Sequence, residues 1–464
     1  GDAMRGRQAG TVDEMRASMW VADQMEKIGL QPMGDMGSWF QWWSMRRTRI
    51  SSISSSVKIN GQALTLWKDI TPTSNTAADV TGPTLFVADI RDTTIDVRGK
   101  VVVTPLVSPN LQQVRTTTNT WDYNYTRSAL GGFNAMARRG AVAVIVIADT
   151  IADKAFDGVG IVQSRGTYDV VGGVPRFTRN PNAGQAQPTT PPQTVVRPAP
   201  VFLIRSSAMA ALRTDGQPVE IKIRSEQFET PSVNVIGVVR GTDPALRDEY
   251  VVFSSHQDHD GVRYTVAGDS IWNGADDNAS TSVALLAIAR AWKAQPSKRS
   301  ALFIFHGAEE RGLLGSRYHV AHPVVPLEKM VAVLNGDMIG RNHPDTASIL
   351  GVQPPHRNST ALVQMALEAN QRTARFVLDS IWDRPTHPEG WYFRSDHLPY
   401  ARLRVPALMF STNLHSDYHT PMDNPDRINF PKLTRMTQWM YLTGWLVANA
   451  KERPGIDPDF QLER

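Results

Sequence analysis

The sequence contains no cysteine among its 464 residues. This absence excludes disulfide bonds, thiolate zinc sites and cysteine nucleophiles together. It leaves the redox compartment open, because a protein without thiols is stable in reducing and in oxidising surroundings alike.

Long apolar runs and blocks of like charge are also missing. No run approaches the ~18 apolar residues that a membrane helix needs, so we expect no membrane span. The net charge of +4 is small for this length, and Lys and Arg form no cluster, so nucleic-acid and membrane-surface partners are not expected. The chain starts at Gly1 without an initiator methionine or a visible signal peptide, as a processed chain would.

The composition is that of an ordinary globular protein, and two parts of the chain differ in their sequence pattern. Hydrophobic residues make up 41% and charged residues 20% of the chain, and the length predicts two domains or one domain with a large insert. Residues 60–228 hold short strands, one helix near Gly131–Arg139 and a loop rich in proline over Arg179–Pro200. The strands expected in this part are Thr84–Ala88, Lys100–Thr104 and Ala141–Ile147.

The rest of the chain alternates strands and helices. A helix over Thr11–Leu30, stopped by Gly29, precedes a strand at Trp39–Trp43, whose tryptophans we interpret as core residues. After Ser232 the β-α-β-α-β order predicts an α/β fold with a mostly parallel central sheet and helices on both faces. Its strands are expected at Val233–Val239, Val251–Phe253, Ala301–Phe305 and Met330–Asn335, and its helices at Asn278–Lys293 and Leu313–Val320.

Polar side chains follow these strands at the ends where sites of α/β proteins form. Each one has an ordinary structural interpretation, such as a helix N-cap for an Asp, and only their joint occurrence at one sheet edge predicts a metal centre. Imidazole and carboxylate oxygens suit Zn²⁺, and would also accept Co²⁺ or Mn²⁺. The candidate ligands are His256, Asp277, Glu310, Asp337 and His419.

The same segments resemble peptidase family M28, the zinc metallopeptidases that include aminopeptidase Y, glutamate carboxypeptidase and glutaminyl cyclase. The likeness covers most of residues 1–50 and 230–445. It is carried by Val251–Asp258, Asn273–Ser280, Gly307–Ser316, Leu334–Met338 and Tyr418–Asp423, with support from Gly6–Thr11, Arg394–His397 and Val405–Leu408.

The resemblance implies a role for each candidate ligand. Asp277 would bridge two Zn²⁺, with His256 and Asp337 completing one site and Glu310 and His419 the other. A cis peptide is expected between Asp277 and Asn278.

The resemblance also implies catalytic groups. Glu309 would be the general base for a metal-bridging water, and Asp258 would hold the imidazole of His256 from behind. Tyr392, close to the Arg394–His397 segment, is a candidate oxyanion donor in the substrate site. The remaining histidines near the motifs are interpreted as structural or supporting residues: His259, His306, His397 and His415.

A second resemblance concerns the middle of the chain. Arg98–Val103 and Gly131–Ile147 are similar to a protease-associated (PA) domain, a small mixed α/β module often inserted into this family. We therefore expect a peptidase domain over 1–59 and 229–464 and an inserted PA domain over 60–228. Members with this insert are commonly secreted or periplasmic, and the same location is expected here.

The implied function is an exopeptidase acting on peptides, with aminopeptidase activity as the first hypothesis. A carboxypeptidase of the same fold stays open, because its basic pocket cannot be located from sequence. Glutaminyl cyclase typically uses one zinc, and the presence of both His256 and Asp337 favours two metals and hydrolysis. A receptor-like module without catalysis would have lost ligands, and none is missing.

Overall fold

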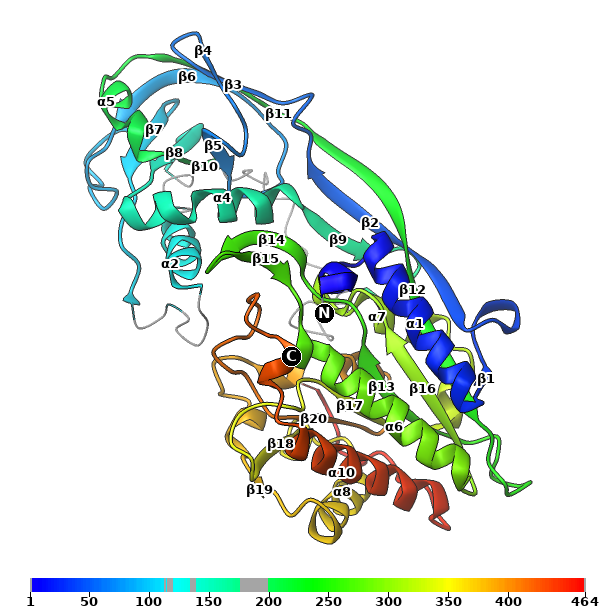
Figure 1. Ribbon diagram of the computed structural model, residues 1–464. Coiled ribbons are helices and arrows are strands. Elements are labelled where there is room, and N and C mark those ends of the chain that lie inside the picture. Colours follow the sequence, from blue (N-terminus) through cyan, green and yellow to red (C-terminus); the bar gives the residue numbers. More distant parts are fainter. Residues whose placement is uncertain (1, 112–113, 115–119, 134–138, 176–198, 463–464) are drawn as a thin grey trace, which may run out of the picture.

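The computed structural model describes residues 2–111, 114, 120–133, 139–175 and 199–462, which form two lobes around two large sheets (Figure 1). The loop expected at 179–200 lies almost wholly outside the described residues. So do residues 134–138 of the helix expected near 131–139, of which the described residues are the 3-10 turn Gly131–Phe133 and Arg139, which lies in a turn. No helix in the described ranges has both the length and the apolar character needed to cross a membrane.

The first sheet has ten strands, with parallel pairs in its middle and between β18 and β19 at one edge. Strands β20, β17, β13 and β16 run parallel, β12, β2 and β9 continue antiparallel on one side, and β18 is antiparallel to β20 on the other. The α/β class is thus confirmed, with antiparallel strands added at both sides. The order is β19 (Val377–Leu378), β18 (Thr346–Leu350), β20 (Ala407–Ser411), β17 (Met330–Gly336), β13 (Tyr250–His256), β16 (Ser300–His306), β12 (Ser225–Val239), β2 (Phe40–Ile50) and β9 (Thr167–Val170), with β1 (Gln31–Pro32) beside β12.

Helices cover both faces of this sheet, so its central strands are buried on both sides. One core contains residues of α1 (Val12–Ile28), α6 (Thr281–Ala294), α8 (Thr360–Arg372) and α10 (Phe430–Asn449). On the other face, α7 (Leu314–Ala321) and α9 (His397–Arg402) pack against apolar residues of the same strands.

The first helix shows how local sequence sets the boundaries. The side chain of Thr11 caps α1 by accepting a hydrogen bond from the N–H of Asp13, and Gly29 ends it at a φ of 87°. Glycine tolerates this left-handed conformation, in which its N–H bonds back to Met25 and Glu26. The helix expected at Thr11–Leu30 is therefore confirmed.

The second sheet has eight strands and two apolar cores, one on each face. It starts at Ser56 and ends at Ile223, whereas β9, inside the expected insert of 60–228, pairs with the first sheet. Its strand order is β4 (Gln62–Leu64), β3 (Ser56–Ile59), β11 (Pro218–Ile223), β6 (Ala78–Phe86), β7 (Val101–Pro105), β8 (Ala143–Ile147), β10 (Val201–Ile204) and β5 (Ile70–Pro72), with helices α2 (Trp121–Leu130), α4 (Thr150–Ser164) and α5 (Met209–Leu212). We call this part the inserted lobe.

A two-stranded ribbon lies between the lobes (Figure 1). It consists of β14 (Gly261–Val266) and β15 (Asp269–Trp272) and packs against α4. The ring of Tyr264 on β14 stacks on Tyr123 of α2 at 5.4 Å between centroids. The ribbon thereby links the inserted lobe to the residues that follow β13.

Phe253 provides a test of the core that contains residues of α1, α6, α8 and α10. Its ring stacks on Phe303 and meets Trp292 edge-on, and α10 approaches it so closely that a Cβ on Gly444 would lie 2.3 Å from the ring. We expect Phe253→Ala to lower the free energy of unfolding by about 3–5 kcal/mol, measured by urea denaturation. The matched change Phe430→Ala, at a side chain that is 61% exposed, should stay within about 0.5 kcal/mol. Equal effects at the two positions would contradict this packing.

Candidate metal centre

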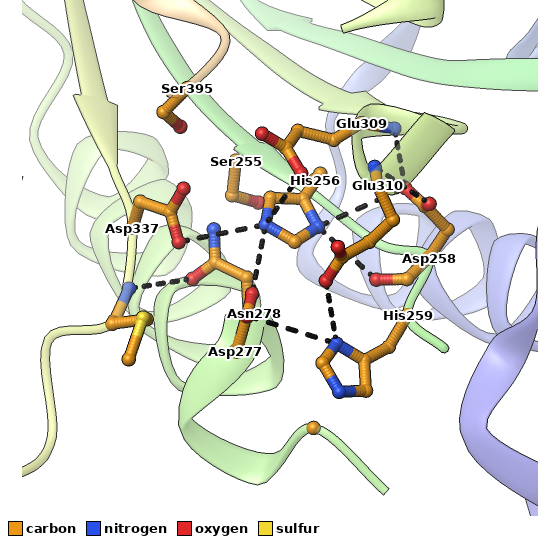
Figure 2. A network of polar contacts seen from close by, with 12 residues as sticks. Ser255, His256, Asp258, His259, Asp277, Asn278, Glu309, Glu310, Asp337 and Ser395 are labelled. Atoms are coloured by element: carbon orange, nitrogen blue, oxygen red, sulfur yellow. Dashed lines mark hydrogen bonds and ion pairs between the residues drawn. The ribbon is translucent and has the colours of Figure 1, made fainter. Parts of the chain in front are cut away.

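Polar side chains from the ends of three strands of the first sheet and from the turn before α6 lie close together at one edge of this sheet (Figure 2). His256 is the last residue of β13, and Asp337 directly follows β17. Glu309 and Glu310 lie in a 3-10 turn after β16, and Asp277 lies in the π-helical turn Ala275–Ser280 that precedes α6. Because β13, β16 and β17 are parallel neighbours, their carboxyl ends meet at the same place.

The five candidate ligands come together in two groups that share Asp277. One oxygen of Asp277 lies 3.2 Å from Nε2 of His256, which is 3.6 Å from Asp337. The other oxygen lies 3.1 Å from Nε2 of His419, which is 3.2 Å from Glu310. Within each group the ligand atoms lie within 4.8 Å of one another, close enough to hold a cation. The two oxygens of one carboxylate thus face different groups.

His259 joins the second group, although its sequence context indicated only a structural role. Its Nδ1 lies 2.8 Å from Glu310 and 3.9 Å from Asp277. Gly274, at a φ of 58°, leaves room for this ring, since a Cβ there would lie 2.3 Å from it. The sequence offered one signal for this role of His259: it follows His256, the last residue of β13, by three positions.

The polar atoms of the centre fit divalent cations. Nε2 of His256, Nε2 of His419 and Oε1 of Glu310 are buried and have no hydrogen-bond partner among the described residues. Buried carboxylates at such distances repel one another and lose their hydration. A cation bound between imidazole nitrogens and carboxylate oxygens would reduce the repulsion among the carboxylates and replace the hydration that they lose.

Asp258 supports the centre in a different way from the one expected. Its carboxylate accepts hydrogen bonds from the N–H groups of Glu309 (2.9 Å) and Glu310 (3.3 Å). Nδ1 of His256 lies 3.1 Å from the main-chain carbonyl of Asp258 and 3.8 Å from its carboxylate. The carbonyl therefore orients the imidazole, and the carboxylate fixes the turn that carries the glutamate pair.

Glu309 is placed for proton transfer. Its carboxylate lines the cavity beside the two groups and lies 3.8 Å from Nε2 of His256. Burial raises the pKa of Glu309 well above its ordinary value, against the opposing effect of His256, and the neighbouring Glu310 adds to the rise. A carboxyl group with a raised pKa can hold a proton at a pH where most glutamates cannot.

The backbone around Asp277 is held by hydrogen bonds to two partners. Asp423 accepts hydrogen bonds from the N–H groups of Asp276 and Asp277, and the side chain of Asn278 donates to the carbonyl of Gly336 at 2.8 Å. The peptide bond between Asp277 and Asn278 is cis, as expected from the resemblance.

Beside the centre lies a cavity of about 780 Å³ lined by carboxylates of the centre, by aromatic side chains and by three arginines, Arg317, Arg394 and Arg402. Tyr392 is not among its lining residues: this side chain is fully buried and its ring stacks on His356 at 4.2 Å. The expectation that Tyr392 serves the substrate site is therefore corrected. Tyr418 lines the cavity instead, and its hydroxyl accepts a hydrogen bond from Arg394 at 2.7 Å.

The other three histidines near the motifs lie outside both ligand groups. Burial lowers the pKa of His306 well below its ordinary value and that of His397 to about 3, so both rings are neutral. His415 lies 3.5 Å from Asp276. These positions agree with the structural roles expected for them.

Comparisons with known proteins agree with this geometry. Residues 234–443 match the model of Peptidase family M28. Aminopeptidase YwaD of Bacillus subtilis (strain 168) is 27% identical over 241 residues, which cover 50% of this chain and 48% of that protein. A probable leucine aminopeptidase 2 of Aspergillus oryzae is 34% identical over 122 residues, or 26% of this chain and 22% of that protein. The chain thus spans about half the length, or less, of these two relatives.

Two solved structures share the fold across nearly the whole chain. An aminopeptidase from Aneurinibacillus sp. strain AM-1 gives a TM-score of 0.54 at 18% identity, covering 98% of this chain and 93% of that one. BSAP, a zinc aminopeptidase from Bacillus subtilis, gives 0.55 at 18% identity, covering 99% and 96%. Residues 234–443, somewhat less than half of the chain, thus resemble peptidase family M28. The fold of nearly the whole chain is similar to that of the two solved structures.

Glu14 of α1 provides a pH test of the surroundings of the centre. It is buried and accepts hydrogen bonds from the N–H of Gly10 and the hydroxyl of Ser232. Burial, reinforced by Asp258, raises its pKa from 4.5 to about 8. Because the folded state has the higher pKa, protonated Glu14 stabilises the fold fully below pH 4.5, and this contribution is lost as the pH rises through about 8.

We therefore expect Glu14→Gln, whose amide can serve both partners, to gain stability relative to the parent as the pH rises. Between about pH 5 and about pH 9 the difference in unfolding free energy should grow by about 2–4 kcal/mol, measured by denaturation at each pH. Glu26→Gln, on the exposed side of the same helix, should show no such trend. A difference for Glu14→Gln that does not change with pH would refute the assignment.

Proposed function

We propose that this chain is an aminopeptidase that uses two Zn²⁺ to hydrolyse the amino-terminal residue of peptides. The observation that supports it best is the carboxylate of Asp277, whose two oxygens face two separate groups of ligand atoms. His256 and Asp337 would hold one ion and Glu310 and His419 the other, with His259 beside the second. Two similar proteins are aminopeptidases by name and BSAP is a zinc aminopeptidase, which supports both the activity and the metal.

The two ions would supply polarisation of the scissile carbonyl and a lower pKa for the attacking water. Glu309 takes the proton of that water as the water attacks, and then gives it to the departing amine. Its carboxylate is close enough to the ligand groups for both transfers, since it lies 3.8 Å from Nε2 of His256. Asp258 keeps the glutamate in place through the N–H of Glu309.

The cavity walls suit a peptide amino terminus. Glu309 and Glu389 line the cavity without being proposed ligands, and their carboxylates attract an α-ammonium group. We propose that Tyr418 donates a hydrogen bond to the oxyanion, in the role first expected for Tyr392. Arg394 fixes the Tyr418 hydroxyl and is itself paired with Glu389 at 2.7 Å. A carboxypeptidase would need an unpaired basic site for the substrate carboxylate instead.

The inserted lobe agrees in position with a PA domain, and we propose that identity together with a secreted or periplasmic location. Its sheet lies between β2 and β12 in sequence, as an insertion would. Nucleic acid is not proposed as a partner.

Glu309→Gln tests the general base. We expect kcat to fall by about 10²–10⁴-fold, because the amide cannot accept the proton, while bound zinc stays unchanged. Turnover of an aminoacyl chromogenic substrate and elemental analysis measure the two quantities. Glu328→Gln, on an exposed turn, serves as the control. Retained activity would remove Glu309 from this role, and lost zinc would make it a ligand.

Metal removal tests the proposal as a whole. A chelator should abolish turnover of the aminoacyl substrate, and two equivalents of Zn²⁺ per chain should restore it. A peptide with a blocked amino terminus should remain uncut, since the α-ammonium is the recognised group. Full activity without metal would end the proposal. One equivalent of zinc together with cyclisation of an amino-terminal glutamine would favour the cyclase alternative.

A further inference from the structure

Asp260 is a buried acid beside the centre that the proposed chemistry does not use. Its carboxylate lies 3.0 Å from Nδ1 of His419, the nitrogen that points away from the ligand groups. The side chain also pairs with Arg263, and Arg311 lies 3.8 Å away. Only 3% of Asp260 is exposed, so its position is set by protein contacts and not by solvent.

The main chain at Asp260 is held by the inserted lobe. Arg165, the C-cap of α4, donates from Nη1 to the carbonyl of Asp260 at 2.9 Å and from Nη2 to the carbonyl of Val262. The carbonyl of Arg165 in turn accepts a hydrogen bond from Nε of Arg47 on β2 at 2.6 Å. One guanidinium therefore joins the end of an inserted helix to the segment that carries Asp260.

Neighbouring contacts hold the same segment against the inserted lobe. A Cβ on Gly158 of α4 would lie 3.0 Å from the ring of Tyr264, so the helix and the ribbon are in close contact. The segment between β13 and β14 thus has the ligand groups on one side and the inserted lobe on the other.

We propose that Arg165 is a positioning residue for the metal centre, acting through Asp260 on His419. A hydrogen bond to the distal nitrogen of a ligating imidazole fixes the tautomer and the direction of the ring and raises its basicity. Here a side chain of the inserted lobe holds the main-chain carbonyl of Asp260, the residue whose carboxylate lies beside Nδ1 of His419. The inserted lobe thereby controls the affinity of the second ligand group. This inference rests on the proposed role of His419 as a ligand.

Zinc binding is the direct test. The full-length apo protein is titrated with Zn²⁺ against a competing chelator, and a parallel titration with Co²⁺ follows the visible absorption of the ligand set. The variants are Asp260→Ala, Asp260→Asn, Arg165→Met and Arg165→Lys. Arg205→Met is the matched control, because Arg205 bonds to Lys68 and Asp157 within the inserted lobe.

Asp260→Ala should weaken the binding of one of the two ions by about 10–100-fold and leave the other unchanged. Asp260→Asn should recover most of the loss, because its amide oxygen still accepts from Nδ1–H. Arg165→Met should act in the same direction by about 3–10-fold and change the Co²⁺ spectrum, and Arg205→Met should do neither. With both sites saturated by zinc, Arg165→Met should lower kcat more than it raises KM.

Unchanged affinity and an unchanged Co²⁺ spectrum in Asp260→Ala and Arg165→Met would overturn the inference and leave the proposed function intact. If either variant fails to fold, Asp260→Asn and Arg165→Lys decide, with Arg165→Lys expected to fall between the parent and Arg165→Met. A parent protein that binds no zinc would overturn the proposed function together with the inference.

Discussion

Mutual repulsion among desolvated carboxylates at one sheet edge is the constraint on which this structure depends. Asp277, Glu309, Glu310 and Asp337 are brought together with little access to water. Buried charges of one sign are tolerated only when protons or cations compensate them. The imidazoles lie among these carboxylates, and Asp277 belongs to both groups of potential ligand atoms.

The first sheet supplies the rigidity that holds such a cluster together. Strands β13, β16 and β17 are buried on both faces, and a functional residue ends or follows each one. Their apolar side chains fix the strands in the core, so packing determines where the ligands at the strand ends lie. Hydrogen bonds that the carboxylates of Asp258 and Asp423 accept from main-chain N–H groups then fix the turns that carry the glutamates and Asp277.

The sequence allowed the strand ends to be predicted, but not the side-chain directions around them. Short apolar strands followed by His256 and Asp337 were readable, because parallel strands align their carboxyl ends. Tyr392 was wrongly placed in the cavity because it lies between Trp391 and Phe393, which do line it. In a 3-10 turn successive side chains point about 120° apart, so its neighbours face the cavity while Tyr392 packs on His356. The contact between His259 and Glu310 depends on a ring orientation that spacing alone does not determine.

The junction of the two lobes was hidden from sequence for a different reason. Strands β2 and β12 pair without interruption from Phe40 opposite Val235 to Ile50 opposite Ser225. This ladder runs out of the first sheet, and the chain then enters the second sheet at β3 and leaves it at β11. A continuous backbone ladder resists bending more than a flexible linker does. The β2–β12 ladder and the pairing of β2 with β9 therefore set the distance from Arg165 to Asp260. Arg47 of β2, which bonds to Arg165, is more than a hundred positions away from it in the chain. An insertion joined in this way can act on a site to which it contributes no ligand.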